Sequence, residues 1–281
     1  MFQDITIAFI GSGTMAEAMI RGLLTQEIVA PEQIIAAGPR TERGAELLDK
    51  HGVKVTTDNR QAAEEGQIVV LSTKPQVLET VMTEIRGHLR RRDLLLSILA
   101  GVPIRKVANG LAHAAVVRAM PNTPAQIGQG ITVWTATPEV SDLQKQQAQA
   151  ILGSLGDEIF MGEEDYLDMA TALSGTGPAY VFMVMEAMID AGVHMGFSRR
   201  VAAQLVFQTI RGSVEYAERS GKHVAELRNQ VTSPGGTTAE ALYHLEKGGL
   251  RTVISRGIFA AYERSIALGR GKKHADVEVE G

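Results

Sequence analysis

The feature that most constrains the fold is a regular alternation of short apolar runs with helix-like stretches before residue 160. Several runs are apolar throughout, which is typical of strands covered on both faces of a mainly parallel sheet. This alternation predicts a doubly wound α/β sheet. The predicted strands are Ile5–Ile10, Gln33–Ala37, Lys54–Thr56, Ile68–Ser72, Leu94–Ile98, Val116–Met120, Gly130–Thr135 and Glu158–Phe160. The predicted helices include Met15–Leu24, Arg43–Lys50, Gln76–Arg86 and Asp142–Leu155, the last with Ser141 as its N-cap.

The first predicted strand ends on a glycine-rich turn, Gly11-Ser12-Gly13-Thr14-Met15-Ala16. In this G-x-G-x-x-A pattern, the first glycine permits a tight turn, and the second lets the backbone approach a pyrophosphate. The phosphates are then expected on free N–H groups at the start of the following helix. Because the pattern occupies the first strand–helix junction, it predicts a Rossmann-type dinucleotide site.

The end of the second predicted strand indicates which dinucleotide is bound. Enzymes that use NAD usually carry an acidic residue there for the ribose 2′-hydroxyl. This chain instead has Gly38-Pro39-Arg40-Thr41, with Arg43 nearby. A guanidinium suits a 2′-phosphate, so NADP(H) is predicted, with NAD(H) as a second cofactor that stays open. The alternative is that Arg40 is only a solvated residue at a helix start.

After Phe160 the strand pattern ends and a series of helices is predicted. We expect a Rossmann-type dinucleotide-binding domain over residues 1–162, a helical substrate-binding and dimerisation domain over 163–270, and a disordered tail over 271–281. The predicted breaks between helices are Gly175-Thr176-Gly177-Pro178, Gly196, Gly221, Ser233-Pro234-Gly235-Gly236 and Gly248-Gly249.

One predicted helix, Ala179–Met195, indicates a partner subunit. Its charged side chains, Glu186, Asp190 and His194, form a single polar stripe, and apolar side chains cover most of its remaining circumference. Such a helix must be buried on several sides, which a domain of about 110 residues can hardly achieve alone. A homo-oligomer through the helical domain is therefore predicted. The alternative is a central helix in a monomeric bundle.

Further loops are candidate parts of the site. Proline restricts the segments Ser72-Thr73-Lys74-Pro75 and Met120-Pro121-Asn122-Thr123-Pro124, which follow strands at the edge where ligands of such sheets bind. Either segment can also be an ordinary exit from a strand. Ser233-Pro234-Gly235-Gly236-Thr237-Thr238 offers N–H groups and hydroxyls to a small carboxylate, or is a turn with Thr237 or Thr238 as N-cap. Ser174-Gly175-Thr176-Gly177-Pro178 is a second turn of this kind.

The composition argues against several other functions. The 281 residues include no cysteine, so disulfides and thiolate chemistry are excluded. The net charge of −4 provides no basic surface for nucleic acid or an anionic membrane. No apolar run approaches the roughly 20 residues of a membrane span, and no signal-peptide pattern is present, so we expect a cytoplasmic protein. The histidines are scattered without metal-ligand spacing, so no metal is predicted.

Taken in order, these segments resemble the pyrroline-5-carboxylate reductases over nearly the whole chain. The resemblance is carried by Ile7–Ala16, Leu71–Gln76, Met120–Ala125, Leu173–Tyr180 and, most specifically, Val231–Thr238 followed by Ala241-Leu242. It implies hydride transfer from NAD(P)H to C5 of the cyclic imine Δ1-pyrroline-5-carboxylate, which gives L-proline. It also implies a helical domain that interleaves with that of a second subunit.

The resemblance implies roles for individual residues. The substrate carboxylate is expected at Ser233, Gly236 and Thr237, and the ring nitrogen at Thr238, which is the candidate catalytic residue. Further substrate contacts are expected at Ser174, Gly175 and Thr176. The implied cofactor contacts are Gly11, Ser12, Gly13, Thr14, Met15, Arg40, Asn59, Ser72, Thr73, Lys74, Pro75, Met120, Pro121, Asn122 and Thr123. The chain departs from the family's pattern at Gly38-Pro39, Thr73, Thr176 and His223-Val224, and the first departure leaves the 2′-phosphate geometry open.

The implied chemistry needs no strong acid. A cyclic imine takes up a proton readily, so the enzyme's main contribution is orientation, worth roughly 7–11 kcal/mol in favourable cases. We interpret Thr238 as an orienting and proton-relaying group. Two rival functions remain open. One is a 3-hydroxyacid dehydrogenase, against which the lysine-free stretch from Gln146 to Gly221 argues. The other is a non-catalytic NADP(H)-sensing dimer, which would not need the Ser233–Thr238 loop.

Overall fold

The computed structural model describes residues 1–270, and that part of the chain contains one eight-stranded sheet. Its strand order is β3-β2-β1-β4-β5-β6-β7-β8, and neighbours are parallel except β6 and β7. The predicted doubly wound α/β class and every predicted strand are confirmed. The strands are β1 (Ile7–Ile10), β2 (Ile34–Ala37), β3 (Lys54–Thr56), β4 (Ile68–Leu71), β5 (Leu94–Ser97), β6 (Val116–Met120), β7 (Gly130–Ala136) and β8 (Gly156–Phe160).

The antiparallel pairing of β7 with β6 departs from the expected parallel pattern. The two strands are joined by the short helix η3 (Thr123–Ile127) alone. A parallel crossover needs about a dozen residues or more, so this short connection returns the chain antiparallel. The turn places the Met120–Thr123 segment at the carboxyl end of β6, on the same edge of the sheet as the glycine turn after β1.

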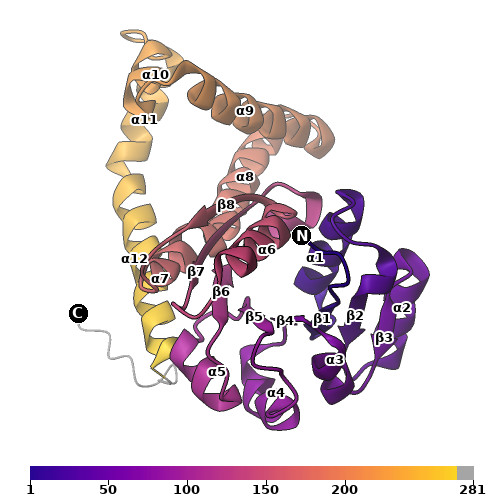
Figure 1. Cartoon of the computed structure of the whole chain (residues 1–281). Coiled ribbons are helices and arrows are strands. Elements are labelled where there is room, and N and C mark those ends of the chain that lie inside the picture. Colours follow the sequence, from indigo (N-terminus) through magenta and orange to yellow (C-terminus); the bar gives the residue numbers. More distant parts are fainter. Residues whose placement is uncertain (271–281) are drawn as a thin grey trace. The chain divides into compact units, whose positions relative to one another are not determined.

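Helices cover both faces of the sheet (Figure 1). The layer with α1 (Thr14–Thr25), α2 (Thr41–His51) and α6 (Asp142–Gly153) packs on one face, and α3 (Asn59–Glu65), α4 (Leu78–Ile85) and α5 (Ile104–Leu111) pack on the other. Along β1, Ile7 and Phe9 belong to the first layer, whereas Ala8 and Ile10 belong to the second, and all four are fully buried. This two-sided burial is why the strands lack polar alternation.

The described chain divides into two compact units whose limits differ from the predicted domains. The first unit contains Met1–Thr176 and, among the described residues, also 261–270, and the second is Gly177–Ala260. The predicted limits of 162 and 163 differ from these because α7 (Tyr166–Ala170) and the end of α12 (Leu250–Gly269) bond to the sheet unit. Ser265 donates a hydrogen bond of 2.7 Å to Asp168, and a Cβ at Gly101 would lie 2.9 Å from that of Leu268. The predicted tail, 271–281, lies outside the described residues.

The second unit contains α8 (Gly177–His194), α9 (Arg199–Ser220), α10 (Val224–Gln230), α11 (Thr237–Lys247) and the start of α12. Helices α8 and α9 approach closely where a Cβ at Gly192 would lie 2.9 Å from that of Ala202. Within the described residues, one chain leaves apolar side chains of α8 uncovered: Phe182 and Met183 are 58% and 62% exposed. This agrees with the prediction that a single helical domain cannot bury this helix alone.

The predicted helix break at Gly175–Pro178 is wrong. Helix α7 continues through a π-helical turn, Thr171–Gly175, into α8. The resulting stretch, Tyr166–His194, is long and apolar enough to cross a membrane by length and composition, which the sequence analysis did not expect. Such a helix is also found in soluble proteins, so this measure alone assigns no membrane role.

Helices α1 and α6 approach closely at Gly22, where an added Cβ would collide with the backbone carbonyl of Ser154. Replacing Gly22 with alanine is expected to lower the free energy of unfolding by about 1–3 kcal/mol, because a backbone atom cannot move aside as a flexible side chain can. Unfolding in urea, followed by circular dichroism, measures the change.

The matched control is Gly153→Ala at the end of α6. A Cβ at Gly153 meets no atom within 4 Å in the described part of the chain. Alanine there should be neutral or should stabilise the protein by up to about 1 kcal/mol. Equal unfolding midpoints for the two variants would contradict the close packing at Gly22.

Candidate active site

The glycine turn after β1 is packed directly against the loop that follows β4. Gly11 has a φ of +108°, and a Cβ there would lie 2.7 Å from backbone atoms of Ser72 and Thr73. Only glycine meets both the conformation and the space at this position. The Ser72 hydroxyl donates a 2.7 Å hydrogen bond to the Gly11 carbonyl, and the Gly11 N–H donates one of 2.9 Å to Ala37. Two segments predicted to bind the cofactor are thus one packed structure.

The start of α1 fits a pyrophosphate. Gly13 is the N-cap, and no side chain caps the helix, so the first N–H groups, those of Thr14 and Met15 among them, lack intrahelical acceptors. A Cβ at Gly13 would meet nothing within 4 Å in the part of the chain that is described. The open space and the uncapped, positive end of the helix dipole suit an anionic group that approaches the backbone closely.

A cavity of about 280 Å³ lies beside this turn. Its lining combines the glycine turn with the two proline-restricted loops and with the segment predicted to contact substrate. Asn122 joins these parts: its amide donates to the Ser174 carbonyl (3.2 Å) and accepts from the Ile131 N–H (3.0 Å). The residues that line the cavity are Met15, Ser72, Thr73, Ile98, Met120, Pro121, Asn122, Thr123 and Gly175. Ile98 was not predicted, because nothing distinguishes it from other apolar strand residues.

The π-turn brings Gly175 into the cavity wall. A Cβ at Gly175 would lie 2.7 Å from the Met120 methyl carbon, so glycine lets the two segments meet. The hydroxyls of Ser174 and Thr176 donate to the carbonyls of Ala170 (3.0 Å) and Thr171 (2.9 Å) of the same helical stretch. Single π-turns within helices are frequent at functional sites, and this one coincides with the predicted substrate contacts.

Arg40 is free to meet a 2′-phosphate. It is exposed at the N-cap position of α2, and its side chain makes no hydrogen bond or ion pair with the described residues. The neighbouring Gly38 is buried, and a Cβ there would collide with the Ser12 hydroxyl. The close approach of Ser12 therefore requires a glycine at this position.

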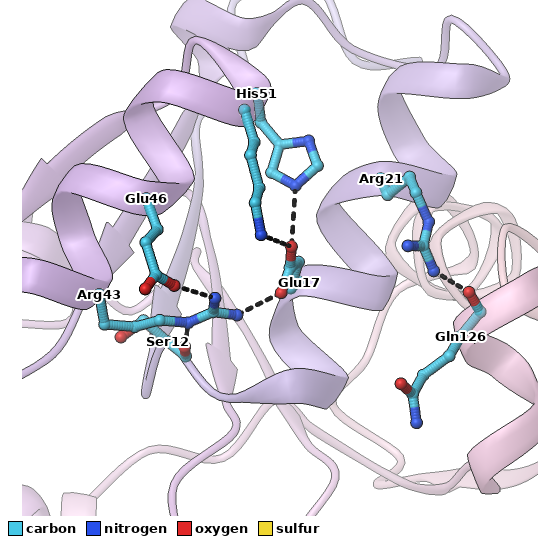
Figure 2. A network of polar contacts seen from close by, with 8 residues as sticks. Ser12, Glu17, Arg21, Arg43, Glu46, His51 and Gln126 are labelled. Atoms are coloured by element: carbon cyan, nitrogen blue, oxygen red, sulfur yellow. Dashed lines mark hydrogen bonds and ion pairs between the residues drawn. The ribbon is translucent and has the colours of Figure 1, made fainter.

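Arg43 has other partners. Its three guanidinium nitrogens reach the Ser12 carbonyl (3.0 Å), Glu46 (2.8 Å) and Glu17, respectively (Figure 2). The hydrogen bond from Arg43 holds the pKa of the Glu17 carboxyl below its ordinary value, and the same contact raises the pKa of the Arg43 guanidinium. The pair therefore stabilises the fold above the ordinary carboxyl pKa, and this contribution is lost as the pH falls through the lowered one. Glu17 was not predicted; its only signal was an acid in the first turn of α1.

Asn59, Lys74 and Pro75 are further predicted cofactor residues that lie outside the cavity lining. Asn59 begins α3, where its amide nitrogen donates to Glu84 (2.7 Å), and its buried amide oxygen accepts no hydrogen bond within residues 1–270. Lys74 and Pro75 are exposed at the start of η2 (Pro75–Val77). Cofactor contacts at these residues stay predictions.

In the second unit, the Ser233–Thr238 loop leads into α11. Gly235 has a φ of +67°, and the Gly236 N–H donates to the Ser233 carbonyl (3.1 Å). Gly236 is the N-cap, so Thr237 and Thr238 are the first helical residues, and the alternative of a threonine cap is wrong. Neither threonine hydroxyl makes a hydrogen bond with the described residues, which leaves both hydroxyls and the first N–H groups available to an anion.

The sheet, glycine turn and cavity define a dinucleotide-binding oxidoreductase. A family model described as NADP oxidoreductase, coenzyme F420-dependent, matches residues 6–101, and one for pyrroline-5-carboxylate reductase dimerisation matches residues 164–268. The chain is 40% identical over 268 residues to the pyrroline-5-carboxylate reductase of Synechocystis sp., with 95% of this chain and 100% of that protein aligned. It is 39% identical over 263 residues to the pyrroline-5-carboxylate reductase of Pseudomonas aeruginosa, with 93% of this chain and 96% of that protein aligned.

Solved structures agree with the sequence comparisons. The crystal structure of Plasmodium falciparum pyrroline carboxylate reductase with NADP bound is similar to this chain with a TM-score of 0.87 and 34% identity, over 94% of this chain and 98% of that one. This chain therefore belongs to the pyrroline-5-carboxylate reductase family, and the resemblance drawn from its sequence motifs is confirmed.

Arg40→Asp tests the predicted contact with the 2′-phosphate. The substitution removes a guanidinium and places a carboxylate near the phosphate, so the KM for NADPH should rise by about tenfold or more. The KM for NADH should change much less, because NADH lacks that phosphate. Steady-state kinetics with each cofactor measure both values.

Arg91→Asp, the same change at another exposed arginine, controls for the altered net charge. It should leave the ratio of the two KM values unchanged. Equal effects of Arg40→Asp on NADPH and NADH would show that Arg40 does not bind the 2′-phosphate.

Proposed function

We propose that this chain reduces Δ1-pyrroline-5-carboxylate to L-proline with NADPH. The observation that carries the proposal is family membership over nearly the full chain, together with an anion-binding loop at Ser233–Thr238 that a dinucleotide site alone would not need. The relative from Plasmodium falciparum, whose structure has NADP bound, supports NADP(H) as the cofactor. Family membership also disfavours the two rivals, a 3-hydroxyacid dehydrogenase and an NADP(H)-sensing dimer.

The chain's own residues would hold the cofactor along the edge of the sheet. The uncapped start of α1, at Gly13, Thr14 and Met15, would bind the pyrophosphate, and Arg40 would bind the 2′-phosphate. The cavity walled by Met120–Thr123 and by Ser72 would hold the nicotinamide end. When bound, NADPH supplies a hydride.

The loop before α11 would hold the substrate. The N–H groups of Gly236 and Thr237 would bind its carboxylate, with Ser233 closing the turn, and the Thr238 hydroxyl would orient the ring nitrogen. The hydride adds to C5 of the protonated imine while the electron pair of the C=N bond moves to nitrogen, which keeps its proton as the amine of proline. One proton is consumed when the imine is protonated, and the amine takes up a second from solvent as proline becomes its zwitterion. The enzyme's contribution is orientation.

A second copy of the chain would cover the exposed apolar side chains of α8. Val181, Phe182 and Met183 are each at least 44% exposed in the single chain. The dimerisation family model spans residues 164–268, which include all of α8, and this supports a protein partner over lipid for the apolar stretch Tyr166–His194. A cytoplasmic location is part of this proposal.

Turnover tests the proposed function. The purified protein should oxidise NADPH, with loss of absorbance at about 340 nm, only when Δ1-pyrroline-5-carboxylate is added, and L-proline should form in equal amount. Because Arg40 would bind the 2′-phosphate, which only NADPH carries, kcat/KM should be higher with NADPH than with NADH. No turnover with either cofactor would contradict the proposal.

Thr238→Ala tests the orienting role of the hydroxyl. The variant should lose about ten- to a hundredfold in kcat/KM for the imine, since a hydrogen bond to a charged group is removed, while the Kd for NADPH stays unchanged. Thr238→Ser keeps the hydroxyl and should retain most of the activity. Full kcat/KM in the alanine variant would show that the hydroxyl has no role in the reaction.

A further inference from the structure

Arg43 is the residue that ties α2 to the glycine turn. It lies two residues into α2, outside the lining of the cavity, yet its Nε donates a 3.0 Å hydrogen bond to the carbonyl of Ser12 (Figure 2). Its terminal nitrogens bond to Glu17, in the first turn of α1, and to Glu46, one turn further along α2. One guanidinium thus bonds to three groups. Two of them, the Ser12 carbonyl and the Glu17 carboxylate, belong to the glycine turn and to the helix that follows it.

We propose that Arg43 is a positioning residue for the dinucleotide, held in place by Glu17 and acting through the Ser12 carbonyl. This inference rests on the dinucleotide site of the proposed function. It assigns Arg43 a role distinct from that of Arg40, whose exposed side chain makes no hydrogen bond or ion pair within residues 1–270.

The contact with Ser12 controls the direction of a peptide group at the site. A trans peptide is planar, with its carbonyl and the following N–H on opposite sides. Holding the Ser12 carbonyl toward Arg43 therefore also fixes the direction of the Gly13 N–H and the entry of the chain into α1. The Arg43 and Glu17 side chains are only 15% and 20% exposed, so water screens this contact less than it screens a surface ion pair.

The cluster also neutralises a charge that would oppose cofactor binding. Glu17 lies in the first turn of α1, the same helix end that would bind the pyrophosphate, where a free carboxylate would repel it. Arg43 contacts one carboxylate oxygen, and Lys50 (3.7 Å) and His51 (3.4 Å) approach the other. Arg43 therefore both orients the turn and offsets the charge of Glu17.

The same contacts separate the roles of the two arginines. Each guanidinium nitrogen of Arg43 already has an acceptor, so this side chain is committed to the turn and its helix. Arg40 is left to contact the 2′-phosphate, which NADPH has and NADH lacks. Loss of Arg43 should weaken the binding of both cofactors equally, because both carry the pyrophosphate. Loss of Arg40 should weaken mainly the binding of NADPH.

The test measures the Kd of NADPH and of NADH by fluorescence titration of the full chain carrying Arg43→Gln. Both constants should rise about tenfold, by the same factor, since charge-assisted contacts near the pyrophosphate are lost. At saturating NADPH, kcat should stay within about twofold of the wild type. Glu46→Gln is the matched control: it removes the partner of Arg43 that is 56% exposed, and should leave both constants unchanged.

Arg43→Lys is the second variant if Arg43→Gln does not fold. A single ammonium cannot span the Ser12 carbonyl and Glu17 together, so both constants should rise by about threefold. Glu17→Gln and Arg43→Gln should also be non-additive in their effect on Kd, because they break one contact.

Unchanged Kd values for both dinucleotides in the Arg43 variants would overturn the inference, whether or not kcat at saturating cofactor falls. A rise in Kd for NADPH alone would also overturn it, because Arg43 would then be a ligand of the 2′-phosphate. Failure of the proposed function gives a different result: the wild-type chain would then show no turnover of Δ1-pyrroline-5-carboxylate, while the Kd values of its Arg43 variants for the dinucleotides could still be compared.

Discussion

The site depends on the contact between Gly11 and the backbone of Ser72 and Thr73. A side chain at residue 11 would force these segments apart, and the φ of +108° excludes one in any case. Because the two segments touch, the start of α1 lies beside the loop that helps to wall the cavity. The positions proposed for the pyrophosphate and the nicotinamide are therefore set by one backbone contact, which joins the ends of adjacent parallel strands, β1 and β4.

Most of the sheet could be predicted because a strand that is buried on both faces is an uninterrupted apolar run in the sequence. Strands such as Ile68–Leu71 and Leu94–Ser97 are apolar at every position but the last serine of β5, and glycine or polar residues end them. The antiparallel turn into β7 could not be seen this way, since a run of apolar residues carries no direction. The composition of α8 also indicated that one helical domain could not bury it, and the exposure of Phe182 and Met183 agrees with that prediction.

The candidate site was predictable where function requires a residue type that is unusual for its position. Gly11 and Gly13 follow a strand, and the glycines of the Ser233–Thr238 loop precede a helix, so each is visible as a motif. Glu17 was missed, and the reason for a glycine at residue 38 could not be seen, because each depends on a tertiary neighbour: Glu17 on Arg43, and Gly38 on the Ser12 side chain. The π-turn at Thr171–Gly175 was likewise invisible, because its glycine looks like a helix break until the packing of Met120 is known.

The central claim is that a dinucleotide held by this glycine turn delivers its hydride to C5 of the cyclic imine. The most direct measurement uses NADPH with deuterium in place of both hydrogens at C4 of the nicotinamide, in ordinary water. Mass spectrometry and NMR of the proline formed should show a single deuterium, located at C5. Proline without deuterium, or proline that takes up deuterium at C5 from heavy water when ordinary NADPH is used, would contradict the account.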